Sequence, residues 1–256
     1  ELRGELTINC AGPWADIILN SSDNGKGLHQ IRRSEGIHVI TRSLSDRAVT
    51  MMTPGGRHFF IIPWRGHSLI GTTDREYQGD PDNYRVTRES IEEFLSEINR
   101  SFGDGKLSLK DVLFAYGGLR PLVDDQTEGT YTSSRRYEIY NNALDGLEGL
   151  ITVEGGKWTT SRNLAVNVLK MVQVKLKRTL PPSRTDNEYL AGCEIDDMER
   201  FLAEAVGCNA DFNERTVRFL AMHYGTEYAR VLSIARADRS LAATLDADGE
   251  IGAQVV

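Results

Sequence analysis

Apolar positions recur along this chain with two periods, and each period predicts its own kind of structure. Between residues 36 and 74 the apolar runs are short and separated by turns, which is typical of an antiparallel sheet. The predicted strands there are Ile37–Thr41, Ala48–Met52, His58–Trp64 and Ser68–Thr73. From Thr87 to Phe102 the apolar residues fall at helical spacing instead, and Thr87 belongs to the residue types that cap helices.

The segments on either side of this region are patterned as well. Further strands are predicted at Glu5–Cys10, Val112–Tyr116, Tyr137–Tyr140 and Leu150–Val153. The helix predicted after Thr160 carries one apolar side, formed by Leu164, Val168, Leu169, Val172 and Leu176. Two prolines make Thr179–Asn187 a predicted linker. Beyond the linker the pattern is helical throughout, over Ile195–Val206, Asn213–Tyr224 and Thr226–Ala235.

The stretch Leu150–Leu164 combines a strand, a glycine turn and the start of a helix. Glycines let a ligand approach the backbone closely, and a helix start offers unpaired N–H groups with partial positive charge. Lys157, Thr159 and Thr160 add a cation and two hydroxyls, so this corner suits an electron-rich ligand. An ordinary strand-to-helix turn capped by threonine explains the same residues. A Walker A loop is excluded, because its first glycine is missing and Trp158 follows the lysine.

Two arginines, Arg120 and Arg135, each follow a predicted turn, at residues 117–118 and 124–129. Gly117 and Gly118 permit close approach to Arg120, and Pro121 restricts Arg120 to extended geometry. Arg135 begins another predicted strand, so two arginines from neighbouring strands could bind a phosphate or carboxylate in a bidentate manner. The alternative is ion pairing of these arginines with Asp124, Asp125 or Glu128.

Histidine and cysteine spacing gives no sign of a metal site. None of the five histidines belongs to an H-E-x-x-H pattern. His38 lies in an apolar predicted strand, where a histidine is more often a satisfied core or edge residue than a catalyst. The three cysteines, Cys10, Cys193 and Cys208, are widely spaced, which indicates neither a disulfide framework nor zinc and favours a reducing, cytoplasmic setting.

Composition narrows the function classes further. With 256 residues and 40% hydrophobic residues, the chain can form one large domain, or a large and a small one. A net charge of −7 argues against non-specific nucleic-acid binding, which requires a clustered basic surface. No run approaches the roughly 18 to 20 apolar residues of a membrane span.

Four separated pieces of the chain resemble the FAD-dependent, quinone-linked glycerol-3-phosphate dehydrogenases. They are NCAGPWAD (Asn9–Asp16), FFIIPWRGHSLIGTTDREYQGDP (Phe59–Pro81), GGLRPLVDD (Gly117–Asp125) and VEGGKWTTSRNLA (Val153–Ala165). The tail FNERTVRFLAMHYGTEYARVL looks like the helical C-terminal domain of that family. The pieces stand in the family's order, and the likeness covers nearly the whole chain.

The resemblance implies an α+β or α/β fold of the glycine-oxidase-like FAD-dependent oxidoreductase type. Residues 1–180 would hold a partial FAD-binding domain (1–35 and 150–180) and an antiparallel-sheet substrate domain (mainly 36–149). Residues 190–256 would form a truncated helical domain. The implied cofactor is FAD, near a set of residues comprising Gly12, Pro13, Trp14, Gly155, Gly156, Lys157, Thr159 and Thr160.

The implied reaction is hydride transfer from C2 of sn-glycerol 3-phosphate to FAD, which gives dihydroxyacetone phosphate. By the resemblance His38 matches the active-site histidine, while Arg120, Arg135 and Lys157 match substrate-site residues, with Arg120 and Lys157 counted as catalytic. Electrons would pass to a membrane quinone from an enzyme peripheral on the inner face of the cytoplasmic membrane. No nucleic-acid partner is implied, and a homodimer is left open.

One departure from the family pattern bears on the cofactor. The G-x-G-x-x-G motif that brings the FAD pyrophosphate to a helix N-terminus is missing from all 256 residues. The chain is therefore expected to be an inactive fragment, cut at both ends, that does not retain FAD. Two other functions stay open: an oxidase that uses oxygen, and a non-catalytic phospho-ligand binding module built on Arg120, Arg135 and Lys157.

Overall fold

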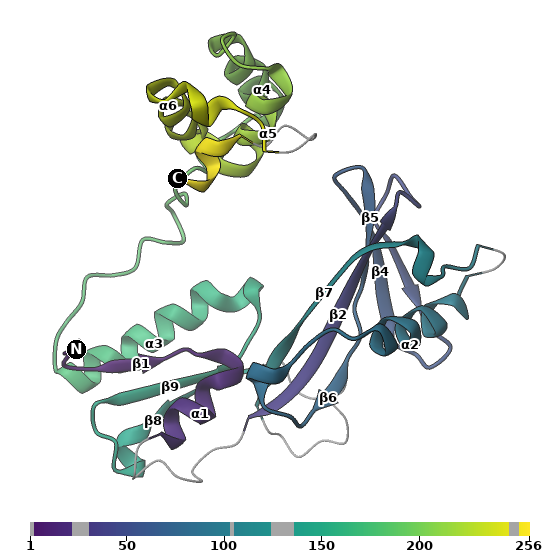
Figure 1. Cartoon of the computed structure of the whole chain (residues 1–256). Coiled ribbons are helices and arrows are strands. Elements are labelled where there is room, and N and C mark those ends of the chain that lie inside the picture. The colour runs from purple at the N-terminus through teal and green to yellow at the C-terminus, as the bar shows by residue number, and fades with distance from the viewer. Residues whose placement is uncertain (1–2, 22–30, 103–104, 124–135, 246–250) are drawn as a thin grey trace. The chain divides into compact units, whose positions relative to one another are not determined.

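The computed structural model describes residues 3–21, 31–102, 105–123, 136–245 and 251–256 (Figure 1). The chain divides into two compact units, Glu1–Leu180 and Pro181–Val256. Arg135 lies outside the described residues, as do its proposed partners Asp124, Asp125 and Glu128.

The first unit contains a three-stranded sheet made from the two ends of its sequence. Strand β9 (Leu150–Gly155) lies in the middle, parallel to β1 (Thr7–Asn9) and antiparallel to β8 (Tyr137–Asn141). Helix α1 (Ala15–Asn20) contacts both β1 and β9. Helix α3 (Ser161–Leu176) packs Val168 against Ile151 and Val153 of β9. The predicted order of strand, glycine turn and helix is confirmed.

The second sheet of this unit has six strands around the long strand β2 (Arg32–Arg42). The other members are β3 (Val49–Met52), β4 (His58–Trp64), β5 (His67–Gly71), β6 (Arg75–Tyr77) and β7 (Val112–Leu122). Figure 1 shows β2 and β7 running side by side along this sheet. All pairings are antiparallel, as the short apolar runs predicted, but β2 pairs with β5, β6 and β7 rather than following a simple meander.

Helix α2 (Arg88–Asn99) covers one face of the six-stranded sheet. Its start is fixed by Thr87, whose hydroxyl accepts a hydrogen bond from the Ser90 N–H at 3.1 Å, while the Ser90 hydroxyl accepts one from the Thr87 N–H. Its apolar side packs on the sheet through a core of Ile37, Val39, Phe59, Ile61, Ile70, Phe94, Leu95 and Ile98. Since side chains alternate along a strand, Ser34, Gly36 and His38 of β2 lie on the opposite face.

A group of polar contacts ties the two sheets together. The Arg33 guanidinium lies 2.5 Å from the Asp16 carboxylate and also donates to the Pro13 carbonyl at 2.8 Å. Trp14 donates its indole N–H to Asp82 at 2.8 Å. Arg33 belongs to β2, whereas Pro13 and Trp14 form the 3₁₀ turn η1 (Gly12–Trp14) that follows β1. The turn is thereby fixed against the start of the six-stranded sheet.

The second unit is helical, with α4 (Met198–Cys208), α5 (Glu214–Tyr224) and α6 (Tyr228–Ala237). Its core contains Ala205, Val217, Leu220, Ala221, Leu232, Ala235, Ile251 and Ala253. Each predicted helix of this part is present, although α4 begins later than expected because Asp197 caps it through the Arg200 N–H. Within the described ranges, every helix is too short or too polar to traverse a bilayer.

Candidate functional site

One pocket of about 560 Å³ brings together residues that are far apart in the sequence. Arg120 and Pro121 come from β7. Gly155 ends β9, Gly156 follows it, and Lys157 is the residue just before the 3₁₀ helix η5 (Trp158–Thr160). Pro13 of η1, Trp158, Ser161 and Leu164 complete the wall with Leu119 and Leu122. Both cations and the glycine turn thus line a single pocket.

The glycine turn is explained partly by the chain itself. Gly155 has φ +72°, and a Cβ at this position would lie 2.4 Å from the Arg136 carbonyl oxygen. Gly156, with φ +93°, donates its N–H to the same oxygen at 3.1 Å. The Thr160 hydroxyl accepts from the Lys157 N–H, but it makes no side-chain cap hydrogen bond at the start of α3. The turn is therefore closed by its own backbone and by one hydroxyl, and it also lines a pocket.

A second, apolar cavity of about 530 Å³ adjoins the first and shares four of its lining residues, Pro121, Gly155, Ser161 and Leu164. Gly12 lines it with φ +57°, a conformation that favours glycine. Ile8, Cys10 and Val168 supply other parts of the wall. A ligand with both an apolar ring system and polar edges would find matching surfaces across the two cavities.

Arg120 is held on the sheet face opposite α2. Its Nη2 donates to the Thr72 hydroxyl at 2.8 Å and its Nη1 to the Thr73 carbonyl at 3.2 Å. The guanidinium lies against the backbone of Gly36, where a Cβ would come within 2.0 Å of Nη2. Glycine at position 36 therefore makes room for this side chain.

His38 lies on the same face, two residues along β2 from Gly36. Its ring stacks on Tyr116 of β7, with centroids 5.1 Å apart and planes inclined by 12°. A Cβ on Gly71 of β5 would lie 2.0 Å from the imidazole Cδ2. Burial, and then the charge of Arg120, lower the pKa of His38 below its usual value near 6.5. The shift favours the neutral imidazole, which is the form that can accept a proton.

The other predicted site residues are placed less centrally. Thr159 is exposed, and Trp14 turns its indole N–H to Asp82. The expectation that Arg120 and Arg135 come from neighbouring strands stays a prediction, because Arg135 lies outside the described residues. Strand β7 pairs with β2, whereas β8, which follows Arg135, pairs with β9 in the other sheet. The described residues contain no cluster of three or more potential metal ligands.

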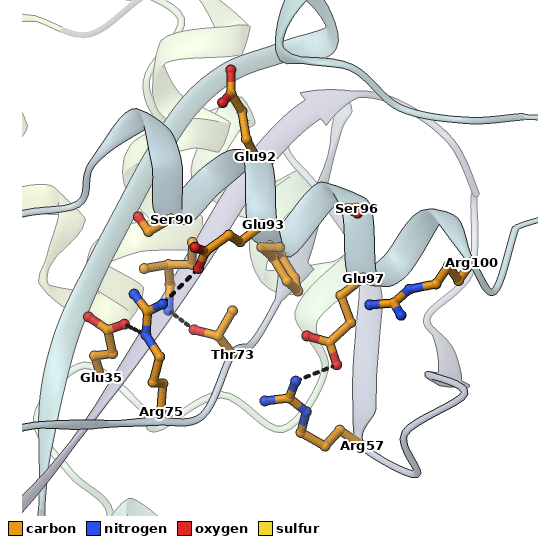
Figure 2. Close-up of a pocket in the computed structure, with 12 residues that line it drawn as sticks. Glu35, Arg57, Thr73, Arg75, Ser90, Glu92, Glu93, Ser96, Glu97 and Arg100 are labelled. Carbon is orange, nitrogen blue, oxygen red and sulfur yellow. Dashed lines mark hydrogen bonds and ion pairs between the residues drawn. The ribbon is translucent and has the colours of Figure 1, made fainter.

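A third cavity, of about 520 Å³, lies under α2 on the other face of the six-stranded sheet. Figure 2 shows Arg75 between Glu35 and Glu93 and Arg57 opposite Glu97, while Glu92 points away from them. Arg75 contacts Glu35 at 2.5 Å and Glu93 at 2.7 Å, and Arg57 contacts Glu97 at 2.8 Å. These ion pairs attach α2 to the sheet, and Arg57 and Arg75 are already matched by carboxylates of the protein.

The sequence alone does not reveal the residues that hold the candidate side chains His38 and Arg120. Thr72 belongs to the piece Phe59–Pro81 that resembles the family, but its residue type indicates no role. Strand register brings Gly71 and Tyr116 beside His38, and it brings Gly36 beside Arg120. One feature of the sequence points to this arrangement. Gly36 and His38 are two residues apart in one strand, so a glycine without a side chain lies on the same face as the candidate histidine.

Comparison with known protein families shows which family the chain belongs to. A model of the family described as FAD dependent oxidoreductase matches residues 2–162. The chain belongs to this family. The predicted fold class is confirmed, since the chain combines a mixed three-stranded sheet and an antiparallel six-stranded sheet with helices.

Relatives within the FAD dependent oxidoreductases are named as glycerol-3-phosphate dehydrogenases. One from Synechocystis sp. is 30% identical over 90% of this chain and 43% of its own length. Glycerol-3-phosphate dehydrogenase 2 of Mycobacterium bovis is 32% identical over 94% of this chain and 40% of its own. A crystal structure of the Bacillus halodurans enzyme complexed with FAD superposes with a TM-score of 0.77, at 30% identity, over 93% of this chain and 46% of that one. The chain spans less than half the length of these relatives.

Proposed function

We propose that this chain contributes the substrate site and one flavin-facing corner of an FAD-dependent glycerol-3-phosphate dehydrogenase. The observation that supports this most is the pocket that Arg120 and Lys157 line together with the glycine turn before α3. The relatives named above support the substrate, because each is a glycerol-3-phosphate dehydrogenase.

The residues present suit the edge of a flavin ring. Gly12 and Gly155 leave an apolar wall free of side chains, and Gly156, Lys157 and the start of η5 border it with polar groups. The helix start favours negative charge through its N–H groups and dipole. FAD, when bound there, supplies a hydride acceptor. Its adenosine and pyrophosphate would be bound by other segments, since G-x-G-x-x-G is missing here.

The side chains of this chain then have distinct roles. Arg120 and Lys157 bind the phosphate dianion, which positions the polyol through a group that does not react. His38, held neutral, accepts the proton of the C2 hydroxyl as the C2 hydride departs, so that the carbonyl of dihydroxyacetone phosphate forms. Arg135 is proposed as a second phosphate ligand on the family resemblance.

Anaerobic bleaching of the flavin tests the reaction. The FAD-loaded protein that contains this chain should lose its yellow colour on addition of sn-glycerol 3-phosphate and keep it with glycerol. His38→Ala should slow the bleaching by at least 100-fold, while inorganic phosphate still binds. If His38→Ala bleaches as fast as wild type, the assigned base is wrong. If wild type binds phosphate without bleaching, a phospho-ligand binding module is indicated instead.

The electron acceptor is proposed to be a membrane quinone, with the protein attached peripherally to the inner face of the cytoplasmic membrane. Reoxidation by a soluble quinone analogue should outpace reoxidation by oxygen. Rapid formation of hydrogen peroxide would indicate an oxidase. The 256-residue chain alone should purify without flavin colour, because it lacks the glycine motif for the pyrophosphate.

A further inference from the structure

Gly71, the last residue of β5, and the next two residues, Thr72 and Thr73, which begin the connection to β6, lie beneath both candidate side chains of the sheet, His38 and Arg120. Gly71 is the register partner of His38 and carries no side chain against the imidazole. The next two residues, Thr72 and Thr73, both accept hydrogen bonds from Arg120. One short connection therefore contacts the proposed base and the proposed phosphate ligand together.

The Thr72 hydroxyl donates one hydrogen bond and accepts another. It donates to the Thr73 carbonyl at 3.2 Å, which leaves its lone pairs for the Nη2 donor of Arg120 at 2.8 Å. The Thr73 hydroxyl accepts the Ile37 N–H at 3.0 Å and so joins the connection to β2. Figure 2 shows Thr73 from the opposite face, beside Arg75. The connection is thus fixed to the sheet on one side and to Arg120 on the other.

These acceptors are a hydroxyl and a carbonyl, so they orient the guanidinium without cancelling its charge. An arginine side chain has several rotatable bonds, and ordering it only when substrate binds would weaken binding. A guanidinium already fixed against Gly36 avoids much of that loss. We propose that Thr72 is a positioning residue, whose hydroxyl holds Arg120 in the direction that binds the substrate's phosphate group. The proposal rests on the function proposed above for Arg120.

The test compares Thr72→Val, which removes the hydroxyl at nearly constant volume, with Thr72→Ser, which keeps it. Thr50→Val on exposed β3 is the matched control. In the FAD-loaded protein, Thr72→Val should raise both the KM for sn-glycerol 3-phosphate and the inhibition constant of inorganic phosphate on the order of tenfold. The kcat should stay within about twofold, since the reacting C2 is not touched. Thr72→Ser should restore both constants, and Thr50→Val should leave them unchanged.

A second measurement keeps the outcome separate from the proposed function. Rotation of the Arg120 guanidinium, followed by NMR on arginine-labelled protein, should be slow in wild type and in Thr72→Ser and fast in Thr72→Val. Wild-type phosphate inhibition together with slow rotation in Thr72→Val would overturn the proposal. Should Thr72→Val not fold, Thr72→Ala is judged by the same two criteria. Failure of the wild type to oxidise the substrate would refute the function alone, and the NMR result would then decide whether Thr72 holds Arg120.

Discussion

The imidazole of His38 lies face to face with the phenol ring of Tyr116, its register partner across β2 and β7. Stacking at 5.1 Å limits rotation of the imidazole, which must point steadily at a hydroxyl to act as a base. Tyr116→Ala should therefore lower kcat about tenfold, whereas Tyr116→Phe should retain most of it. Steady-state kinetics of the FAD-loaded protein decide this, and equal losses in both variants would assign the effect to the phenol hydroxyl instead.

Gly36→Ala should weaken phosphate binding without unfolding the protein. The new methyl would displace the Arg120 guanidinium, which is the end of a flexible side chain and can move at small cost. Gly118, the register partner of Gly36, has open space where a methyl would stand, so Gly118→Ala is a close control. We expect the phosphate inhibition constant to rise on the order of tenfold in Gly36→Ala only, with both thermal midpoints near wild type.

Removing one partner of the buried Arg33–Asp16 pair should be costly. Their side chains are only 12% and 9% exposed, so Arg33→Met leaves a carboxylate buried without its cation. The expected loss is about 3 kcal/mol of unfolding free energy, measured by urea denaturation. Arg218→Met breaks an exposed pair with Glu214 and should change stability by less than about 1 kcal/mol. Similar losses of unfolding free energy in the two variants would contradict the idea that burial makes the Arg33–Asp16 pair costly to break.

Arg120→Met should raise the pKa of His38. Burial, the larger cause of the low pKa, remains in the variant, but the repulsion from the guanidinium is removed. In wild type the folded pKa lies below the unfolded one. Stability linked to His38 is therefore complete above about pH 6.5 and is lost as pH falls through the folded value. Histidine NMR titration measures the shift, and Arg47→Met, at an exposed loop, should leave the pKa of His38 unchanged.

Tyr84→Phe should be neutral or stabilising, by up to about 1 kcal/mol. The Tyr84 hydroxyl is buried next to Gly117, and among the described residues it has no hydrogen-bond partner. Its removal costs no bond and relieves the desolvation of a polar group. A drop in the thermal midpoint would show that the hydroxyl is satisfied in solution by a group such as water.

Much of the fold followed from local pattern, because caps and alternation act over a few residues. Thr87 begins α2 where its cap predicted. By contrast, β7 continues past Tyr116 through two glycines and Pro121, residues that usually end a strand. Among the described strands it pairs with β2 alone, and an edge strand tolerates proline. The candidate site depends on such long-range contacts. Lys157 and Arg120 line one pocket because β7 and β9, which belong to different sheets, contact each other, and their spacing in the sequence could not show this.

Trp158 gives the pocket a built-in optical reporter. Its indole is 96% exposed, against 39% for Trp14 and 48% for Trp64, the remaining tryptophans of the chain. It also forms part of the wall that holds Lys157. A ligand that enters this pocket would displace water from the Trp158 ring more than from the other two indoles. The resulting blue shift of tryptophan emission would report the rate of ligand binding without a dye or label.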